Sequence, residues 1–290
     1  MLKKYKPYLF VLSAAFCWGV IGIFTRNLGA LGISAQTTCF FRNMGTLIIL
    51  GIVFCFMDRS LFRIKLKHLP FFFGTGVLSV LFFSLCYFNC QAISSLAIAS
   101  ILLYTAPTFV VIFSTILFRD RITKYKILAL VITFLGCSFV SGIWSGELSL
   151  TPQILLFGLG SGFFYSLYSI FARYALLHYR PFTVTFYTFL FAGIGSLFLD
   201  NPITMAKSFA NPTAFLLGLG ILIISTIAPY LLYTLGLAEM NSGKASILAS
   251  IEPVVAAFVG ILVFGESLTS GVILGLFCIL TSVFLLQKDH

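Results

Sequence analysis

One acidic residue of this sequence lies far inside an apolar stretch, where its chemistry is constrained. Glu252 and Pro253 follow the run Ala245–Ile251, in which every residue is either apolar or serine. Because an ionised group without water or a partner is strongly unfavourable there, Glu252 must be protonated, paired or hydrated. Such a group can carry protons in a coupled process, or it can act as a structural acid that bonds the carbonyls freed beside the proline. The residues alone leave both roles open.

Arg42 is a basic residue in a comparable position. It lies about seven residues into the apolar stretch 35–57. This depth requires a partner, although the long side chain can also reach towards the membrane surface. Two further roles are open for Arg42: contact with an anionic group of a ligand, and pairing with Glu252.

The sequence around Glu252 has a counterpart in the first half of the chain. The letters ASIL occupy both 99–102 and 245–248, and Pro107 recurs 146 positions later as Pro253. The same offset relates three further pairs: Phe118 with Phe264, Asp120 with Glu266, and Thr123 with Thr269. A duplicated unit of about half the chain is the economical interpretation of this register.

The matched prolines have a mechanical interpretation. Proline removes a helix hydrogen bond and clashes with the preceding turn, so Pro107 and Pro253 are expected to kink two related helices near the middle of the membrane. A kink that only improves packing is the alternative, and it is favoured less for the matched pair than for either proline alone.

The composition defines the class of protein. Of the 290 residues, 60% are apolar and only 9% are charged, and the mean hydropathy is +1.08. No water-soluble domain has this composition, so the sequence predicts an all-α, polytopic membrane protein whose first partner is the lipid bilayer. The formal net charge of +10 would suggest nucleic acid for a soluble chain. Here the basic residues lie between apolar segments, so they indicate topology and no nucleic-acid partner is expected.

Ten hydrophobic segments are each long enough to cross a bilayer, because about 20 residues at a rise of about 1.5 Å span its core of about 30 Å. They lie near 7–26, 35–57, 69–91, 95–118, 125–144, 152–174, 182–200, 213–237, 243–264 and 268–286. The first is expected to be retained, and the short loops are expected to leave no room for a fused catalytic or nucleotide-binding domain.

Lysine and arginine are distributed unequally between the two sides of this predicted membrane. Fifteen lie on the side of the N-terminus and two, Arg26 and Lys207, lie on the other, with Arg42 inside the membrane. Positive charge marks the side that is not translocated. We therefore expect a multi-pass protein of the plasma (inner) membrane with both termini in the cytoplasm.

Each copy of the repeat contains an odd number of predicted spans, five, so the second copy must cross the membrane in the opposite orientation. The two expected domains are 1–146 and 147–290, and Ala106 stands in the first where the second has Glu252. Inverted repeats are typical of transporters, in which two halves exchange conformations around one central site.

Aromatic residues mark the expected lining of that site, because a phenolic hydroxyl away from water seeks a polar partner. Helical spacing and the repeat register select Trp18, Tyr87, Tyr104, Tyr165, Tyr168 and Tyr233. Ser246 and Ser250, which match Ser100 and Tyr104, extend the polar lining. Such a site suits a flat or cationic small molecule. For each aromatic residue alone, the alternative is an interfacial belt or an interhelical hydrogen bond.

Several short motifs spread over essentially the whole chain carry a resemblance to a known family. They are Trp18-Gly19, Arg42, Pro107, Glu252-Pro253 and Gly265-Glu266-Ser267-Leu268. By these motifs the chain resembles EamA-type members of the drug/metabolite transporter superfamily. The resemblance implies ten helices in two inverted five-helix repeats, which move small metabolites by alternating access, often outward and often coupled to protons or exchange. The first repeat departs from the pattern, with Ala106 before Pro107 and Arg119-Asp120-Arg121-Ile122 in place of Gly-Glu-Ser-Leu.

These observations predict a secondary transporter of a small organic metabolite, and the resemblance favours export of amino acids or related compounds. Import of an amine or other nutrient is the alternative, and a multipass membrane enzyme or lipid-handling protein is the alternative of another class. No nucleophile lies near a base, and His68, His178 and His290 cannot form a metal cluster. No enzymatic activity, catalytic residue, metal or cofactor is therefore expected. A monomer and a homodimer both remain open.

Overall fold

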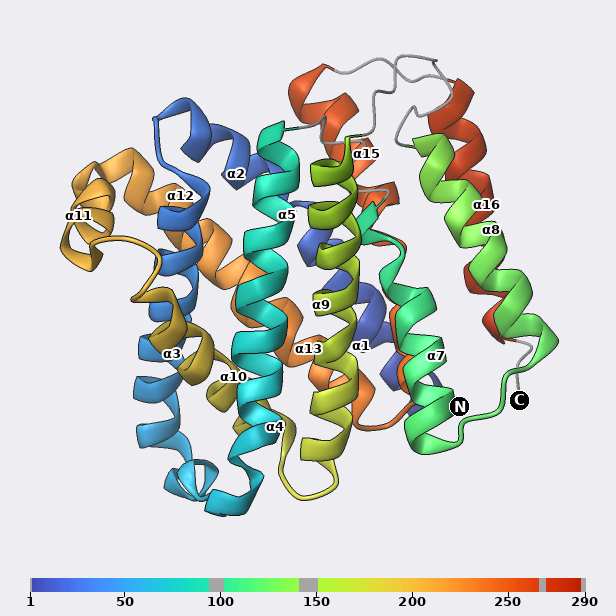
Figure 1. Ribbon diagram of the computed structural model, residues 1–290, viewed down its shortest axis with the longest axis horizontal. Coiled ribbons are helices and arrows are strands. Elements are labelled where there is room, and N and C mark those ends of the chain that lie inside the picture. Colours follow the sequence, from blue (N-terminus) through green and yellow to red (C-terminus); the bar gives the residue numbers. More distant parts are fainter. Residues whose placement is uncertain (1, 94–101, 141–150, 266–269, 288–290) are drawn as a thin grey trace.

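The computed structural model describes residues 2–93, 102–140, 151–265 and 270–287 (Figure 1). All regular secondary structure within these ranges is helical. The first half contains α1 (Leu2–Gly19), α2 (Ile21–Ala30), α3 (Ala35–Met57), α4 (Leu69–Phe73), a π-helical segment (Gly74–Leu81), α5 (Phe82–Ile93), α7 (Ala106–Phe118) and α8 (Lys124–Val140). The second half contains α9 (Pro152–Leu176), α10 (Pro181–Ser196), α11 (Pro202–Lys207), α12 (Pro212–Leu222), a π-helical segment (Ile223–Ile227), α13 (Ala228–Leu237), α14 (Ser242–Ala249), α15 (Glu252–Phe264) and α16 (Ser270–Gln287).

The outer surface and the lengths of the helices are those of a membrane protein. Among the described residues, six stretches are long and apolar enough to cross a bilayer: Tyr5–Ala30, Ala35–Met57, Leu66–Tyr87, Pro152–Leu176, Pro212–Leu237 and Ser242–Phe264. Ala106–Phe118 and Ile273–Ser282 are shorter apolar helices. Large apolar side chains point outward, with Phe198 and Leu262 being 85% and 81% exposed. A surface of this kind is favourable only against lipid or a partner.

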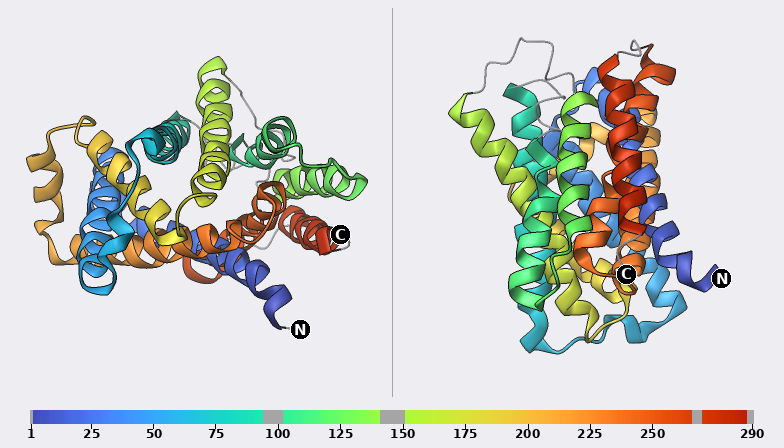
Figure 2. Two further views of the ribbon diagram at one scale, coloured as in Figure 1. Left: turned by 90° about the horizontal axis from the view of Figure 1, so that it is seen from below. Right: turned by 90° about the vertical axis from the view of Figure 1, so that its right-hand side faces the viewer.

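The helices run roughly along one common axis (Figure 2). At one edge of the bundle α8 and α16 pack against each other, and the Thr133 hydroxyl donates a 2.8 Å hydrogen bond to the Ser282 hydroxyl between them. The short helix α11 lies at the opposite edge. The start of α1 and the end of α16 lie at the same end of the bundle (Figure 1).

Polar caps set the starts of several helices. The residues before α3, α9, α11, α12 and α14 are Ser34, Thr151, Asn201, Asn211 and Asn241. The side chain of each accepts a hydrogen bond from a backbone N–H in the first turn, which has no partner within the helix. At these five helices the sequence thus places a residue type that a helix start favours.

Two helical stretches are interrupted at positions related by the sequence repeat. Residues 104–105 form a turn before α7, and residues 250–251 separate α14 from α15. In both cases a proline, Pro107 or Pro253, is the second residue of the new helix. A proline is tolerated there because the N–H that it lacks is not needed in the first turn. Each proline therefore follows a break and starts a helical segment.

The π-helical segments also recur in register. Residues 77–81, the last part of the first segment, lie 146 positions before Ile223–Ile227, the second segment. A π turn inserts an extra residue into the helix and shifts its backbone hydrogen bonds. In the second segment the Thr226 hydroxyl also donates a 2.9 Å hydrogen bond to the Ile221 carbonyl. Such turns are frequent at functional sites.

Helix α1 approaches α15 very closely at Gly19. A Cβ added to Gly19 would lie 2.5 Å from the Cβ of Val255 and 2.9 Å from the carbonyl oxygen of Glu252. Both distances are shorter than van der Waals contact, and one of the neighbours is rigid backbone. Glycine at this position therefore permits the start of α15 to rest against α1.

We expect Gly19→Ala to lower the melting temperature of the protein in detergent, because overpacking costs about 1–3 kcal/mol. Gly22→Ala is the matched control, since nothing lies within 4 Å of a Cβ added there and alanine is the better helix former. Thermal unfolding of the two variants measures the difference. Equal melting temperatures would contradict the close approach of α1 and α15.

Candidate functional site

A small cavity lies beside the two helix breaks, between α7, α9, α14 and α15. The space between its walls, counted together with its opening, is about 250 Å³. Its lining residues are Leu103, Tyr104, Ala106, Pro107, Tyr165, Ser246, Ala249, Ser250 and Glu252. The lining thus combines apolar surface with hydroxyl groups and one carboxyl group.

Positions that the sequence repeat relates lie together on this lining. Three pairs are separated by 146 positions: Leu103 with Ala249, Tyr104 with Ser250, and Ala106 with Glu252. The cavity therefore lies where equivalent segments of the two sequence repeats meet. Its chemistry is nevertheless one-sided, because only the second repeat supplies a carboxyl group.

Glu252 is the first residue of α15 and belongs to the cavity lining. Among the described residues, no N–H or O–H group donates a hydrogen bond to its carboxyl group, and no basic side chain pairs with it. The carboxyl group is therefore available to a proton or to a cationic group of a ligand.

Arg42 on α3 is buried, with 4% of its surface exposed. One of its terminal nitrogens donates a 2.7 Å hydrogen bond to the Ser84 hydroxyl, which itself donates a 2.7 Å bond to the carbonyl of Val80. The Nε of Arg42 and the Oδ1 of Asn43 are buried without a partner among the described residues. An unpaired buried donor on a cation is unfavourable, so an incoming acceptor would be bound favourably.

Arg42 and Glu252 do not pair with each other in the part of the chain that the structure describes. Both side chains nevertheless lie near Tyr230 on α13. The aromatic region therefore separates Arg42 from Glu252, and neither is the direct partner of the other among the described residues.

Trp18 lies at the centre of this aromatic region. Its ring centroid is 5.4 Å from those of Tyr230 and Tyr233 and 6.2 Å from that of Tyr165. Tyr168 stands edge-on to Tyr230 at 5.2 Å. These separations are typical of favourable aromatic pairs. Because Tyr165 also lines the cavity, the aromatic cluster continues from the cavity into the core.

The hydroxyl groups of Tyr168 and Tyr233 hold α9 and α13 together. Tyr168 bonds the Thr234 hydroxyl at 2.6 Å, and Tyr233 bonds the Ser169 hydroxyl at 2.7 Å. Thr234 donates its own proton to the carbonyl of Tyr230 at 2.6 Å, so the Tyr168 hydroxyl is the donor to Thr234. Both phenols have their polar partners within the protein.

The predicted site residues fall into two groups. Those on the cavity lining are Tyr104, Pro107, Tyr165 and Glu252, and those in the adjoining aromatic cluster are Trp18, Tyr168 and Tyr233. Tyr87 is one ring further away: Phe83 lies 5.7 Å from Tyr87 and 5.1 Å from Tyr165. Pro253 is described through its backbone only. The binding roles of all these residues stay predictions.

Sequence reasoning placed Ser246 and Ser250 on a polar lining, and both contribute to the cavity. It missed the small and apolar lining residues Leu103, Ala106 and Ala249. The repeat register was the available signal, because these residues flank or match Tyr104 and Glu252.

A bundle of apolar helices around a small central cavity defines the class of polytopic membrane proteins that handle small molecules. The model of the EamA-like transporter family matches residues 5–142 and 153–287. The chain therefore belongs to the EamA-like transporter family, within the drug/metabolite transporter superfamily. It is a membrane transporter of small molecules and not an enzyme.

Three relatives of this chain are named as transporters or exporters. An uncharacterized transporter of Archaeoglobus fulgidus is 29% identical over 291 residues, which cover 99% of this chain and 97% of the relative. The threonine/homoserine exporter RhtA of Escherichia coli is 27% identical and covers 83% of the chain and 76% of the relative. The pseudopaline exporter CntI of Pseudomonas aeruginosa is 27% identical over 46% of the chain and 45% of the relative.

A solved crystal structure has the same overall fold. It superposes with a TM-score of 0.75 over 98% of this chain and 96% of the other, at 15% sequence identity. At this identity the similarity concerns the fold alone.

We expect Tyr168→Phe to lower the melting temperature, because it removes a hydrogen bond between helices that contributes about 0.6–1.7 kcal/mol in membrane proteins. Tyr165→Phe is the matched control. Tyr165 belongs to the cavity lining and its hydroxyl makes no hydrogen bond with the described residues, so the loss of this hydroxyl should leave the melting temperature unchanged. An equal loss of stability in both variants would contradict the division into packing and cavity tyrosines.

Proposed function

We propose that this protein is a secondary active transporter that exports amino acids or related metabolites by alternating access. The observation that carries the proposal is the cavity beside two helix breaks, with a carboxyl group on its lining that has no partner among the described residues. Binding sites made by discontinuous helices near the bilayer midplane are characteristic of secondary transporters. The broken helices supply polar backbone groups, and Glu252 supplies a group that can exchange a proton.

The proposed architecture has ten spans in two inverted five-helix repeats, with both termini in the cytoplasm. Three features support it: the helix breaks at 104–105 and 250–251, the π-helical segments, and the cavity lining all recur with an offset of 146. The start of α1 and the end of α16 lie at the same end of the bundle, as an even number of spans requires.

A substrate with both an anionic and a cationic group fits the charges of this region. The spare Nε donor of Arg42 suits a carboxylate, and Glu252 together with Trp18 and the tyrosines suits an ammonium group. Amino acids carry both groups. The relative RhtA is named as an exporter of threonine and homoserine, and CntI as an exporter of pseudopaline. Export of amino acids by RhtA supports the same class for this chain.

Import of an amine is the second candidate function, and one observation favours it. The acid on the cavity lining and the neighbouring aromatic rings form a suitable environment for an organic cation. A simple amine would leave the buried Nε of Arg42 without an acceptor, so we place this function second.

The test of transport and coupling is counterflow of radiolabelled amino acids, beginning with threonine, in liposomes that contain the purified protein. We expect the wild-type rate to change with pH and Glu252→Gln to lose this dependence, because glutamine cannot exchange a proton. Glu239→Gln is the control, since Glu239 is an exposed acid outside the cavity. If Glu252→Gln transports normally with the wild-type pH profile, Glu252 is a structural group.

The role of Arg42 is tested by competition between an amino acid and its methyl ester. We expect wild-type counterflow to be inhibited more strongly by the free amino acid, because the ester lacks the charged acceptor for the guanidinium. Arg42→Met should abolish this preference, and Arg42→Lys should retain part of it because the charge remains. Arg59→Met, at an exposed position, should behave as wild type. An unchanged preference in Arg42→Met would exclude carboxylate recognition by Arg42.

A further inference from the structure

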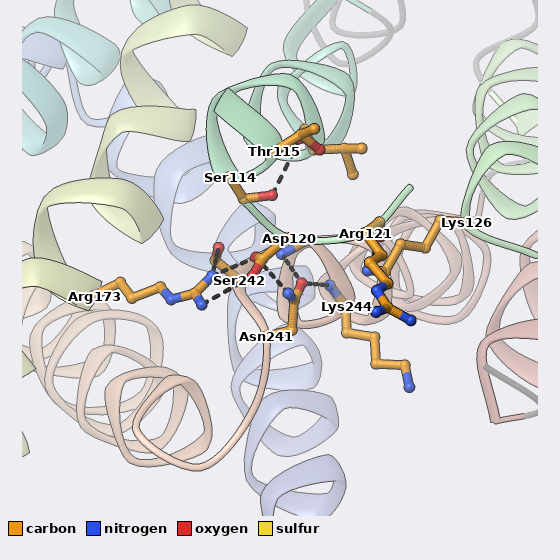
Figure 3. A network of polar contacts seen from close by, with 11 residues as sticks. Ser114, Thr115, Asp120, Arg121, Lys126, Arg173, Asn241, Ser242 and Lys244 are labelled. Carbon is orange, nitrogen blue, oxygen red and sulfur yellow. Dashed lines mark hydrogen bonds and ion pairs between the residues drawn. The ribbon is translucent and has the colours of Figure 1, made fainter. Parts of the chain in front are cut away.

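One carboxylate joins three helix ends at the end of the bundle where α7 stops (Figure 3). Asp120 follows α7 and forms a two-point ion pair with Arg173 in the last turn of α9, including a 3.0 Å bond from Nη2 to Oδ1. The side-chain amide of Asn241, the residue that caps α14, also donates to Asp120. The hydroxyl of Ser242 accepts a 3.3 Å bond from Arg173.

Arg173 also stacks on an aromatic ring. Its guanidinium carbon lies 4.0 Å from the ring centroid of Phe118, the last residue of α7. Charge-assisted bonds and a cation–π contact thus act on the same guanidinium. The side chains of Arg173 and Asp120 are only 26% and 12% exposed, so water screens this pair less than a surface ion pair.

A related contact lies at the opposite end of the bundle. The guanidinium carbon of Arg26 on α2 lies 4.6 Å from the ring centroid of Phe264, the last residue of α15. Phe264 follows Phe118 by 146 positions, and Arg173 follows Arg26 by 147. The ends of α2 and α15 are at the top of Figure 1, whereas the ends of α7 and α9 are at the bottom.

The backbone after each phenylalanine repeats as well. Arg119 and Gly265, which are 146 positions apart, both adopt left-handed backbone conformations, with φ of 55° and 68°. Glycine takes this conformation without strain, whereas an arginine there costs about 1 kcal/mol. At Arg119 this turn directs the chain so that the next residue, Asp120, reaches Arg173.

Each contact connects the two halves of the sequence. The first joins α7 to α9, and the second joins α15 to α2. We propose that Arg173 with Phe118 and Asp120, and Arg26 with Phe264, are two clamps that close the two ends of the transport path. This inference rests on the proposed alternating access: each clamp must open for the cavity to reach the membrane face at its own end, while the other stays closed.

The clamps are tested with a cysteine at Ser246, a cavity residue, in full-length protein whose seven native cysteines have been replaced. A membrane-impermeant maleimide is applied to either face of vesicles of known orientation. We expect Arg173→Ala and Asp120→Asn to increase labelling from the face nearest the end of α7. Arg26→Ala should increase labelling from the opposite face. Each variant should also slow threonine counterflow.

Two control variants remove charge at the same ends without touching a clamp. Arg180→Ala breaks the 2.8 Å Arg180–Asp58 ion pair, which is more exposed at 64% and 40%. Hydrogen bonds from Ser60 lower the pKa of Asp58 below its ordinary value, so this carboxylate stays charged at neutral pH. Lys207→Ala removes an exposed charge on α11. Neither control should change labelling from either face.

The variant Arg173→Lys tests whether increased labelling results from opening of the clamp or from unfolding of the protein. It keeps the charge but not the flat, two-point geometry, so it should give intermediate labelling with a smaller loss of melting temperature than Arg173→Ala. Labelling that rises from the same face in Arg173→Ala and Arg26→Ala, or that rises in neither, would overturn the clamps. If labelling responds as expected but wild-type protein shows no counterflow with any amino acid or amine, the transport proposal fails and the clamps remain.

Discussion

Backbone groups that lose their helical partners cannot face lipid, and this constraint governs the centre of the structure. Hydrocarbon offers no hydrogen bonds, so irregular backbone at membrane depth is tolerated only against protein or a polar cavity. The breaks at 104–105 and 250–251 meet this condition because they border the same cavity. The prolines that follow them preserve each break, since neither can supply the N–H that would restore a continuous helix. The location of the cavity is therefore a consequence of where the backbone is broken.

Close packing around the breaks then determines which side chains can reach the cavity. Gly19 lets α1 touch the start of α15, which brings Trp18 into the aromatic cluster beside the cavity. The hydrogen bonds of Tyr168 and Tyr233 fix α9 against α13. A rigid wall of this kind leaves the broken segments as the parts of the lining with fewer internal constraints. The wall formed by α9 and α13 is rigid, whereas the helix breaks at 104–105 and 250–251 can move more easily. This combination suits a binding site whose access changes while its binding groups stay in place.

Much of the helical layout could be predicted because lipid imposes a simple rule on sequence. Long apolar runs marked the helices, and the 146-residue offset pointed to Tyr104, Pro107 and Glu252 around one centre. Periodicity could not separate tyrosines that face a cavity from those bonded within the core, because both occupy apolar helices. Tyr165 and Tyr168 share a helix face by spacing, yet one lines the cavity and the other bonds Thr234.

Contacts between distant residues were the other limit of sequence reasoning. The partner of Arg42 is the neutral Ser84, and no charge pattern identifies a serine as the partner of a buried cation. The partners of Arg173, which are Asp120 and Asn241, come from two different loops. Local sequence records the end of a helix, but it does not record which other ends meet it in space.

Because α8 and α16 pair at one edge of the bundle, substitutions on their outer surfaces are separate from substitutions at the cavity. These helices bond each other through Thr133 and Ser282 at one edge of the bundle, and none of the residues that line the cavity comes from either of them. Changes on their outer surfaces can accordingly adapt the protein to bilayers of different thickness or composition without altering what enters the cavity. Selection for a particular bilayer would then act on α8 and α16, whereas selection for a particular substrate would act on the helices that line the cavity.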